Sequence, residues 1–216
     1  NDVLPTNITG IVTARDAFVI EFDSASLLKR ISEFRNASVS DESIRLRYFS
    51  NPRSKRYAAG DTRGWKLANA RKSVMADKHW RKRLRPILYR PFDVRQIYYV
   101  PWMVDWPRTE AMPHMLAGEN LGLVTRRAMV GEGSRYFYAS RMIISDGLIR
   151  SDNRGSESLF PLYLYPDTGD SDTSMFPVWP EGKDRRQPNL EPAFVRAIEQ
   201  VAGLVFQSDT RGDLSK

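Results

Sequence analysis

The order of its hydrophobic patterns constrains this 216-residue chain most, because helical periodicity fills its first part and strand-like patterns fill its second. Leu27, Ile31 and Phe34 recur at helical spacing, and the pattern of residues 65–84 predicts a long helix. From residue 87 to residue 165, runs rich in Val, Ile, Tyr and Phe predict strands separated by glycines. Helices followed by strands indicate an α+β fold, with a mixed or mostly antiparallel sheet and helices packed on it.

Further elements and divisions follow from the same patterns and from turn residues. Ser24 is expected to cap the first helix, and a polar segment rich in Asp, Ser, Thr and Pro predicts a linker after residue 166. The predicted elements are a strand or hairpin at 11–22, helices at 24–36, 41–49, 65–84, 110–116 and 190–203, and strands at 87–100, 121–127, 135–144 and 159–165. The predicted divisions are a core at 1–166, a linker or long loop at 167–189, a C-terminal helix at 190–207 packing on the core, and a tail at 208–216.

A block of positive charge lies between Arg53 and Arg90, where thirteen Lys and Arg residues accompany only two acids, Asp61 and Asp77. This excess of +11 exceeds the net charge of +7, so the other 178 residues are slightly acidic. A block of one sign attracts a polyanion, and the 25 arginines outnumber the 8 lysines. Because a guanidinium group can grip phosphates and guanine edges with two parallel bonds, the block indicates nucleic-acid binding. A solvated helix face, or a patch for an acidic protein partner, stays open as an alternative.

Two groups of side chains are candidates for contacts with a nucleic acid. Cations of the predicted helix are expected to bind phosphates: Lys66, Arg71, Lys72, Lys78, Arg81, Lys82 and Arg83. Polar side chains on or between the later predicted strands are expected to read base edges, because Arg bonds guanine O6 and N7 and Asn bonds adenine N6 and N7. These base-reading candidates are Arg126, Arg127, Arg135, Arg141, Arg150, Asn153 and Arg154.

Composition excludes several classes of protein. The chain has no Cys, which excludes disulfides and thiolate zinc sites, and its two histidines, His79 and His114, are isolated and predict structural or surface roles. It has no apolar run of membrane-spanning length, so a cytoplasmic location and no membrane partner are expected. Because it begins with Asn1 and not Met, we expect it to be a piece of a longer polypeptide.

Motifs for catalysis are weak. Asp167, Glu181 and Lys183 have the spacing of a Mg²⁺-dependent nuclease, but such acids need adjacent strands and these lie in the predicted linker. The glycines of residues 131–134 fit a hairpin turn better than a phosphate-binding loop, because neither a following Lys-Ser/Thr pair nor a strand-to-helix crossover is present. We therefore expect no catalytic residues, no metal site and no cofactor in this chain, with the nuclease as the least favoured hypothesis.

Five segments together resemble the C-terminal specificity domain, or target recognition domain, of type ISP restriction-modification enzymes and related single-chain enzymes that carry a methyltransferase. The motif of Arg90, Asp93 and Arg95 is the most specific of them, and the pattern has Gly where this chain has Ala14. The segments are GIVTARDAFVIEFD at 10–23, ILYRPFDVRQIYY at 87–99, WPRTEAMPHML at 106–116, ENLGLVTRR at 119–127 and FPLYLYP at 160–166.

The resemblance implies a target-recognition-domain-like fold that recognises duplex DNA without catalysis of its own. It implies a prokaryotic, cytoplasmic parent enzyme with an adenine methyltransferase domain as neighbour and partner, and with S-adenosylmethionine, ATP and Mg²⁺ as requirements. Because enzymes with different targets share the motif of Arg90, Asp93 and Arg95, it is expected to build the scaffold or the methyltransferase contact, with Asp93 paired to Arg90 or Arg95. A module that docks a basic face on an acidic partner domain is the second hypothesis.

Overall fold

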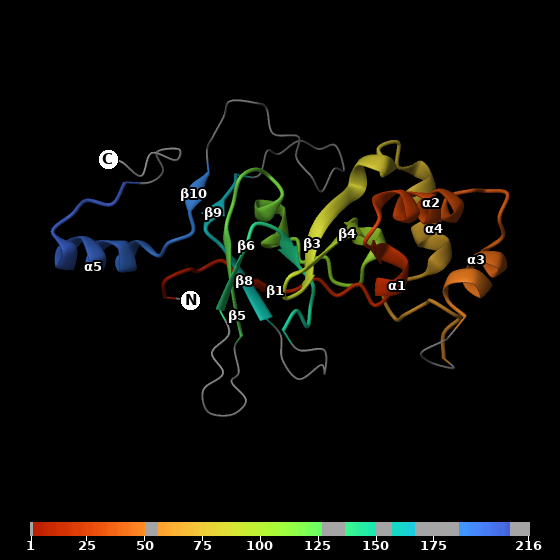
Figure 1. The fold of residues 1–216 in the computed structure, drawn as a ribbon, viewed down its shortest axis with the longest axis horizontal. Helices are drawn as coiled ribbons and strands as arrows, with labels where there is room; N and C mark the ends of the chain where they lie inside the picture. Colours follow the sequence, from red (N-terminus) through yellow and green to blue (C-terminus); the bar gives the residue numbers. More distant parts are fainter. Residues whose placement is uncertain (1, 51–55, 127–136, 150–156, 167–185, 208–216) are drawn as a thin grey trace. The chain divides into compact units, whose positions relative to one another are not determined.

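A computed structural model describes residues 2–50, 56–126, 137–149, 157–166 and 186–207 (Figure 1). The chain divides into two compact units. The first, Ile11–Pro107, is called here the helix–hairpin unit, and the second, Asn1–Gly10 with Arg108–Lys216, is called the sheet unit. Residues 1–166, predicted as one core, thus contain parts of both units. Helices and antiparallel strands occur together, which confirms the predicted α+β class.

The helix–hairpin unit contains α-helices, two 3-10 helices and a small antiparallel sheet in the order β2-β4-β3. Its helix α2 begins at Ser24 because the carboxylate of Asp23, and not Ser24, caps it by accepting hydrogen bonds from Ala25 N and Ser26 N. The elements are α1 (Asp16–Val19), β2 (Ile20–Glu21), α2 (Ser24–Phe34), α3 (Asp41–Tyr48), α4 (Leu67–Ala76), η1 (Trp80–Arg83), β3 (Leu84–Arg90), β4 (Asp93–Tyr98) and η2 (Pro101–Met103).

The long helix predicted at 65–84 is wrong, because α4 ends at Ala76 and the 3-10 helix η1 follows. The carboxylate of Asp77 accepts a hydrogen bond from His79 N at 2.8 Å, which turns the chain out of the helix. The single strand predicted at 87–100 is in fact the β3–β4 hairpin, whose turn contains Pro91 and Phe92.

Phe18 is the centre of the apolar core of the helix–hairpin unit. Its ring lies 5.1 Å from that of Phe34, 5.2 Å from Tyr48 and 5.0 Å from Phe49, measured between centroids. This packing joins α1, α2 and α3, and it places a short helix where the sequence predicts only a strand or hairpin.

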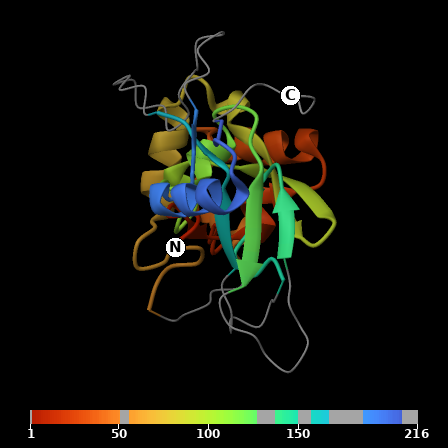
Figure 2. The same cartoon turned by 90° about the vertical axis from the view of Figure 1, so that its left-hand side faces the viewer.

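The sheet unit is built on four antiparallel strands in the order β1-β8-β5-β6, with a separate β9–β10 pair (Figure 2). Buried Asn120 and Asn189 hold its loops. Asn120 donates to the carbonyls of His114 and Tyr163, and Asn189 donates to those of Thr6 and Pro161. The elements are β1 (Ile8–Thr9), η3 (Met112–Met115), β5 (Gly122–Arg126), β6 (Phe137–Ser140), β7 (Ile143–Ile144), β8 (Glu157–Pro161), β9 (Tyr163–Leu164), β10 (Gln187–Pro188) and α5 (Pro192–Ala202).

The C-terminal helix forms as predicted, but it does not pack as predicted. None of the residues of α5 is buried, and Ile198 and Val201 on its apolar side are exposed. In Figure 1 the helix projects beyond β10. The predicted linker lies outside the described residues up to position 185, and the predicted tail lies wholly outside them.

Ala14 has a positive φ of 58°, a left-handed conformation that favours glycine. We expect Ala14→Gly to raise the free energy of unfolding by about 1 kcal/mol, because it removes the clash of Cβ with the backbone. Urea denaturation measures the change. Ala17→Gly in α1 is the control and should lower stability by about 0.5–1 kcal/mol, because its backbone is helical. Equal effects of the two substitutions would contradict the assignment of strain to Ala14.

Candidate nucleic-acid interface

Arg71 is an internal residue, so its predicted role in phosphate binding is wrong. Only 7% of it is exposed, and its guanidinium group donates to the carbonyls of Phe34, Asn36 and Val39 at 2.8 Å each. It also forms an ion pair with Asp41. A buried guanidinium group needs this full set of acceptors, and Arg71 therefore fixes α4 against the end of α2.

Arg83 is the second predicted phosphate ligand that serves the fold instead. Its Nε and Nη2 atoms donate to the two carboxylate oxygens of Asp77 at 2.8 and 3.2 Å. Burial raises the pKa of Asp77, but the hydrogen bonds from Arg83 and His79 outweigh it and leave that pKa below its ordinary value. The charge of Arg83 is thus neutralised inside the helix–hairpin unit, at the turn between α4 and η1.

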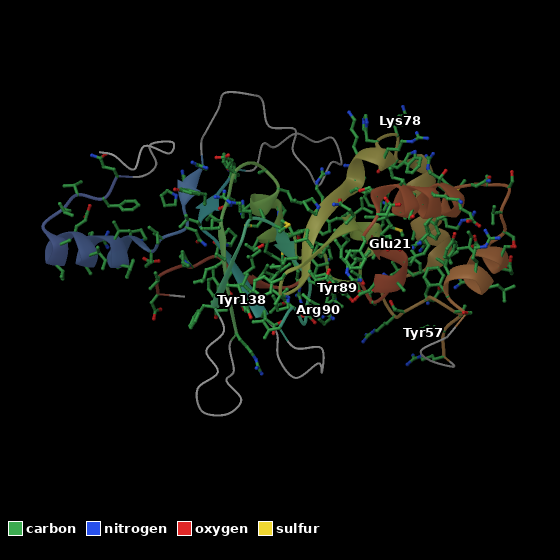
Figure 3. The ribbon with its side chains drawn as sticks, in the orientation of Figure 1. Glu21, Tyr57, Lys78, Tyr89, Arg90 and Tyr138 are labelled. Carbon is green, nitrogen blue, oxygen red and sulfur yellow. The ribbon has the colours of Figure 1, made fainter. Side chains whose placement is uncertain are left out.

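Four of the predicted cations remain exposed on α4, on η1 and between them: Lys72, Lys78, Arg81 and Lys82, together called the η1 patch. Figure 3 shows nitrogen-tipped side chains around Lys78. None of the four forms an ion pair with a carboxylate in the part of the chain that the structure describes. The remaining predicted cation, Lys66, lies 3.8 Å from a carboxylate oxygen of Asp61, which offsets part of its charge.

Trp80 supports the η1 patch from beneath. Its buried ring lies between two guanidinium groups, with Arg81 at 4.4 Å and Arg35 at 4.9 Å from the ring centroid. Arg35 also donates to the carbonyl of Met75 at 3.0 Å, which ties it to the end of α4. This contact holds the guanidinium group of Arg81 on an aromatic ring while its outer face stays in solvent.

The scaffold motif lies at the other end of strand β3. Arg95 donates to both carboxylate oxygens of Asp93 at 3.0 and 2.8 Å, which confirms the predicted pairing of Asp93 with one of the two arginines. Hydrogen bonding from Arg95 lowers the pKa of Asp93. Arg90 instead stacks on Tyr89 at 4.3 Å (Figure 3), and the hydroxyl group of Tyr89 donates to Asp16 at 2.9 Å. These contacts fit the predicted scaffold role.

Of the base-reading candidates, the structure describes Arg126 and Arg141. Arg141 is exposed directly after β6. Arg126 ends β5 and lies opposite Glu157 of β8 in the antiparallel register. Five of the predicted base readers, Arg127, Arg135, Arg150, Asn153 and Arg154, lie outside the described residues.

Glu157 is a fully buried acid next to this candidate region, and no local sequence pattern indicates its burial. It has 0% exposure, and burial raises the pKa of its carboxyl group. Nε and Nη2 of Arg126 are also buried, and they form no hydrogen bond within the described part of the chain. The positive charge of Arg126 lies across the sheet from Glu157 and counters part of the rise in its pKa. The Arg126 side chain is therefore engaged within the sheet and is a poor candidate for reading bases.

The remaining motifs give no second site. Nδ1 of His114 accepts a hydrogen bond from Tyr165 N at 3.1 Å and burial lowers its pKa, which confirms a structural role. Asp167, Glu181 and Lys183, like the glycines at 131–134, lie outside the described residues. The described residues contain no group of three His, Asp or Glu side chains suited to a metal ion. They also contain no helix whose length and apolar character would let it span a bilayer.

Comparison with known proteins gives one family and a set of similar structures. The model of the type ISP C-terminal specificity domain matches residues 2–211, whereas no curated protein matches the sequence. The DrdV–DNA complex is 18% identical with a TM-score of 0.58, covering 91% of this chain and 17% of that chain. LlaBIII, an ATP-dependent type ISP restriction-modification enzyme bound to DNA, is 15% identical with a TM-score of 0.59. The match covers 92% of this chain and 12% of that chain.

A third structure is a nuclease-deletion mutant of the type ISP restriction-modification enzyme LlaGI in complex with a DNA substrate mimic. It is 13% identical with a TM-score of 0.54, and the match covers 87% of this chain and 14% of that chain. The chain thus spans less than a fifth of the length of each of these proteins. The three likenesses establish a shared fold.

The internal role of Arg71 can be tested against its exposed neighbour. Arg71→Gln should lower the free energy of unfolding by about 3 kcal/mol, because it leaves three carbonyls at and after the end of α2, and the Asp41 carboxylate, without their donor. Lys72→Gln should change it by less than about 0.5 kcal/mol. Urea denaturation measures both. A small effect of Arg71→Gln would mean that the guanidinium group is not buried as described.

The Asp77–Arg83 pair predicts a dependence of stability on acid. Because the pKa of Asp77 is lower in the folded state than its unfolded value of about 3.9, the stability it contributes is present above that pH and is lost as pH falls through the folded pKa. Asp77→Asn should therefore cost about 2 kcal/mol at pH 7 and much less near pH 3. Denaturation at both pH values checks this, with Glu110→Gln, an exposed carboxyl, as control. A cost that does not change with pH would count against the pair.

Proposed function

The chain belongs to the type ISP C-terminal specificity domain family, and we propose from this premise that it recognises a target sequence in double-stranded DNA for a larger restriction-modification enzyme. The structures of DrdV, LlaGI and LlaBIII, which share its fold, were determined with DNA or a DNA substrate mimic. The presence of DNA or a DNA mimic in these three structures supports DNA as the ligand of this chain.

The η1 patch is the observation that carries the proposal. Its cations stay exposed while Arg71 and Arg83 of the same charge block are neutralised internally. Exposed charges without a carboxylate partner, carried by α4, η1 and the residues between them, are suited to phosphates, which give affinity and register without reading sequence. We assign phosphate binding to Lys72, Lys78, Arg81 and Lys82, with Lys66 as a weaker contributor.

Sequence selection belongs, in this proposal, to side chains of the sheet unit. Arg141 is exposed at the end of β6, and the five candidates outside the described residues follow or precede β5, β6 and β8 in the sequence. Polar side chains at strand ends can reach base edges in a groove, and a true base reader affects one position of the site by about 1–3 kcal/mol.

The remaining functions belong to other domains of a parent chain. We propose an adenine methyltransferase domain as the neighbour of this chain, a non-catalytic role for the chain itself, and a prokaryotic cytoplasmic location. In this proposal S-adenosylmethionine, ATP and Mg²⁺ serve the parent, and for ATP alone the ATP dependence of LlaBIII supports it. The exposed apolar side of α5 supports a contact with the neighbouring domain, because an uncovered apolar helix face marks an interaction surface. Docking thus accompanies DNA binding in this account.

Salt dependence tests DNA binding by the η1 patch. If about five phosphates are neutralised, a plot of log K against log salt concentration should have a slope of about −4.5. Arg81→Gln combined with Lys82→Gln should bring the slope closer to zero by about 2 and weaken binding to all duplexes alike. Fluorescence anisotropy with a labelled duplex at several salt concentrations measures both quantities.

The matched control is Lys29→Gln combined with Arg196→Gln, which removes the same charge from exposed positions outside the block. It should leave the slope nearly unchanged. Equal effects of the two double substitutions would show that net charge, and not the η1 patch, attracts DNA. Tight binding to a methyltransferase domain without retention on DNA at low salt would favour the docking hypothesis.

A further inference from the structure

Phe92 stands at the turn of the β3–β4 hairpin in an unfavourable conformation and environment. Its φ is 63°, a left-handed value that is strained for a bulky side chain, and 94% of the residue is exposed. Glycine would relieve the strain, and a polar residue would suit the solvent better. Such strain, together with an exposed aromatic ring, points to a contact made outside this chain.

A stack of aromatic rings and guanidinium groups holds the hairpin that carries Phe92. The guanidinium group of Arg95 lies 4.2 Å from the ring centroids of both Phe22 and Tyr89. Arg90 covers Tyr89 at 4.3 Å, and Asp93 binds Arg95 through two oxygens. Because cation–π contacts and a bidentate ion pair fix both sides of the turn, the Phe92 ring projects from a rigid support.

The chemistry around Phe92 favours a nucleic acid over a protein as its partner. Phe22 and Val94 are also exposed, at 65% and 44%, but Arg95 lies against the Phe22 ring and Arg90 stands two positions before Phe92. The central part of a protein interface is depleted of charged residues, whereas an aromatic ring flanked by cations is the arrangement that stacks on bases and attracts phosphates.

The position of the hairpin turn fits a duplex that also contacts the η1 patch. Strand β3 begins directly after η1 and ends at Arg90, so its seven residues separate the patch from the turn by about 20 Å. At about 3.4 Å per base pair this is about six base pairs of DNA. A short duplex is therefore long enough to extend from one end of β3 to the other.

We propose that Phe92 is a wedge that stacks on a base of locally unstacked duplex DNA, with Arg90 beside it as a cation for the flanking phosphates. Apolar side chains inserted at a base step bend and open a duplex in this way, and stacking is tolerant of sequence. The inference rests on the proposed function and deepens it. The Phe92 contact would respond to the shape and deformability of the DNA, and it is separate from the phosphate contacts of the η1 patch.

The test compares the affinity of the chain for two duplexes of the same sequence, one perfect and one with a central two-nucleotide bulge. A wedge binds the bulged duplex more tightly because the bases of the bulge are already unstacked. We expect about tenfold higher affinity for the bulged duplex, which corresponds to the free energy of stacking one base on an aromatic ring. Phe92→Ala should abolish this preference while leaving the salt slope unchanged, and Phe92→Trp should keep it. 2-Aminopurine in the bulge should be quenched by the wild type and by Phe92→Trp, but not by Phe92→Ala.

Phe92→Gly separates function from folding. Because glycine tolerates the positive φ, this variant should unfold at the same or a higher urea concentration than the wild type, yet lose the preference for the bulge. Leu46→Ala, which shortens an exposed apolar side chain of α3, is the control and should keep the preference.

The outcomes distinguish the two proposals. If the wild type binds neither duplex at low salt, the proposed function fails and the wedge with it. If the wild type binds with the expected salt slope but shows no preference for the bulge, or if Phe92→Ala keeps that preference, DNA binding stands and the wedge is overturned. The exposed ring would then be assigned to contact with a protein domain.

Discussion

The fold of the helix–hairpin unit depends on buried guanidinium groups, each of which needs hydrogen-bond acceptors. Arg15 is buried with its guanidinium carbon 3.9 Å from the Trp65 ring centroid, and it donates to the carbonyls of Thr13 and Met103 and to Asp105. Arg71 binds three carbonyls and a carboxylate in the same manner. Because leaving any of these charges unpaired in the interior would cost several kcal/mol, the contacts fix where the loops and helix ends lie.

This requirement divides one block of charge into two kinds of residue. Arginines paired with a carboxylate inside the unit, such as Arg71 with Asp41 and Arg83 with Asp77, belong to the fold and are not available to a ligand. The η1 patch consists of four of the block's exposed cations, and strand β3 carries the chain from that patch to the hairpin turn with Phe92. The same folded unit thus presents a charged contact and an aromatic contact at the two ends of one strand. In these proposals the η1 patch provides affinity for DNA, and Phe92 deforms the DNA.

Local patterns predicted the fold class well and the functional roles less well. Helices α2 and α3 were predictable because apolar spacing and polar caps are local signals, and the strands near residues 122–126 and 157–164 likewise carry their own patterns. The break after Ala76 was missed because it depends on the Asp77 side chain, and the β3–β4 hairpin was missed because its turn uses Phe92 in place of glycine. The internal role of Arg71 depends on carbonyls some 35 positions away in the sequence, which no count of charges can reveal. The one sequence feature that could have indicated a role for Phe92 is its position inside the most specific motif, between Arg90 and Asp93.

Chemical footprinting of lysines tests the central claim most directly, because it shows which cations lie against DNA. The chain is acetylated with an amine-reactive ester in the presence and absence of a duplex at low salt, and the extent of modification at each lysine is measured by mass spectrometry. If the η1 patch binds phosphates, the duplex slows modification of Lys72, Lys78 and Lys82 and leaves Lys29 as reactive as before. Equal protection of Lys29 and the three patch lysines, or no protection of any of them, would contradict it.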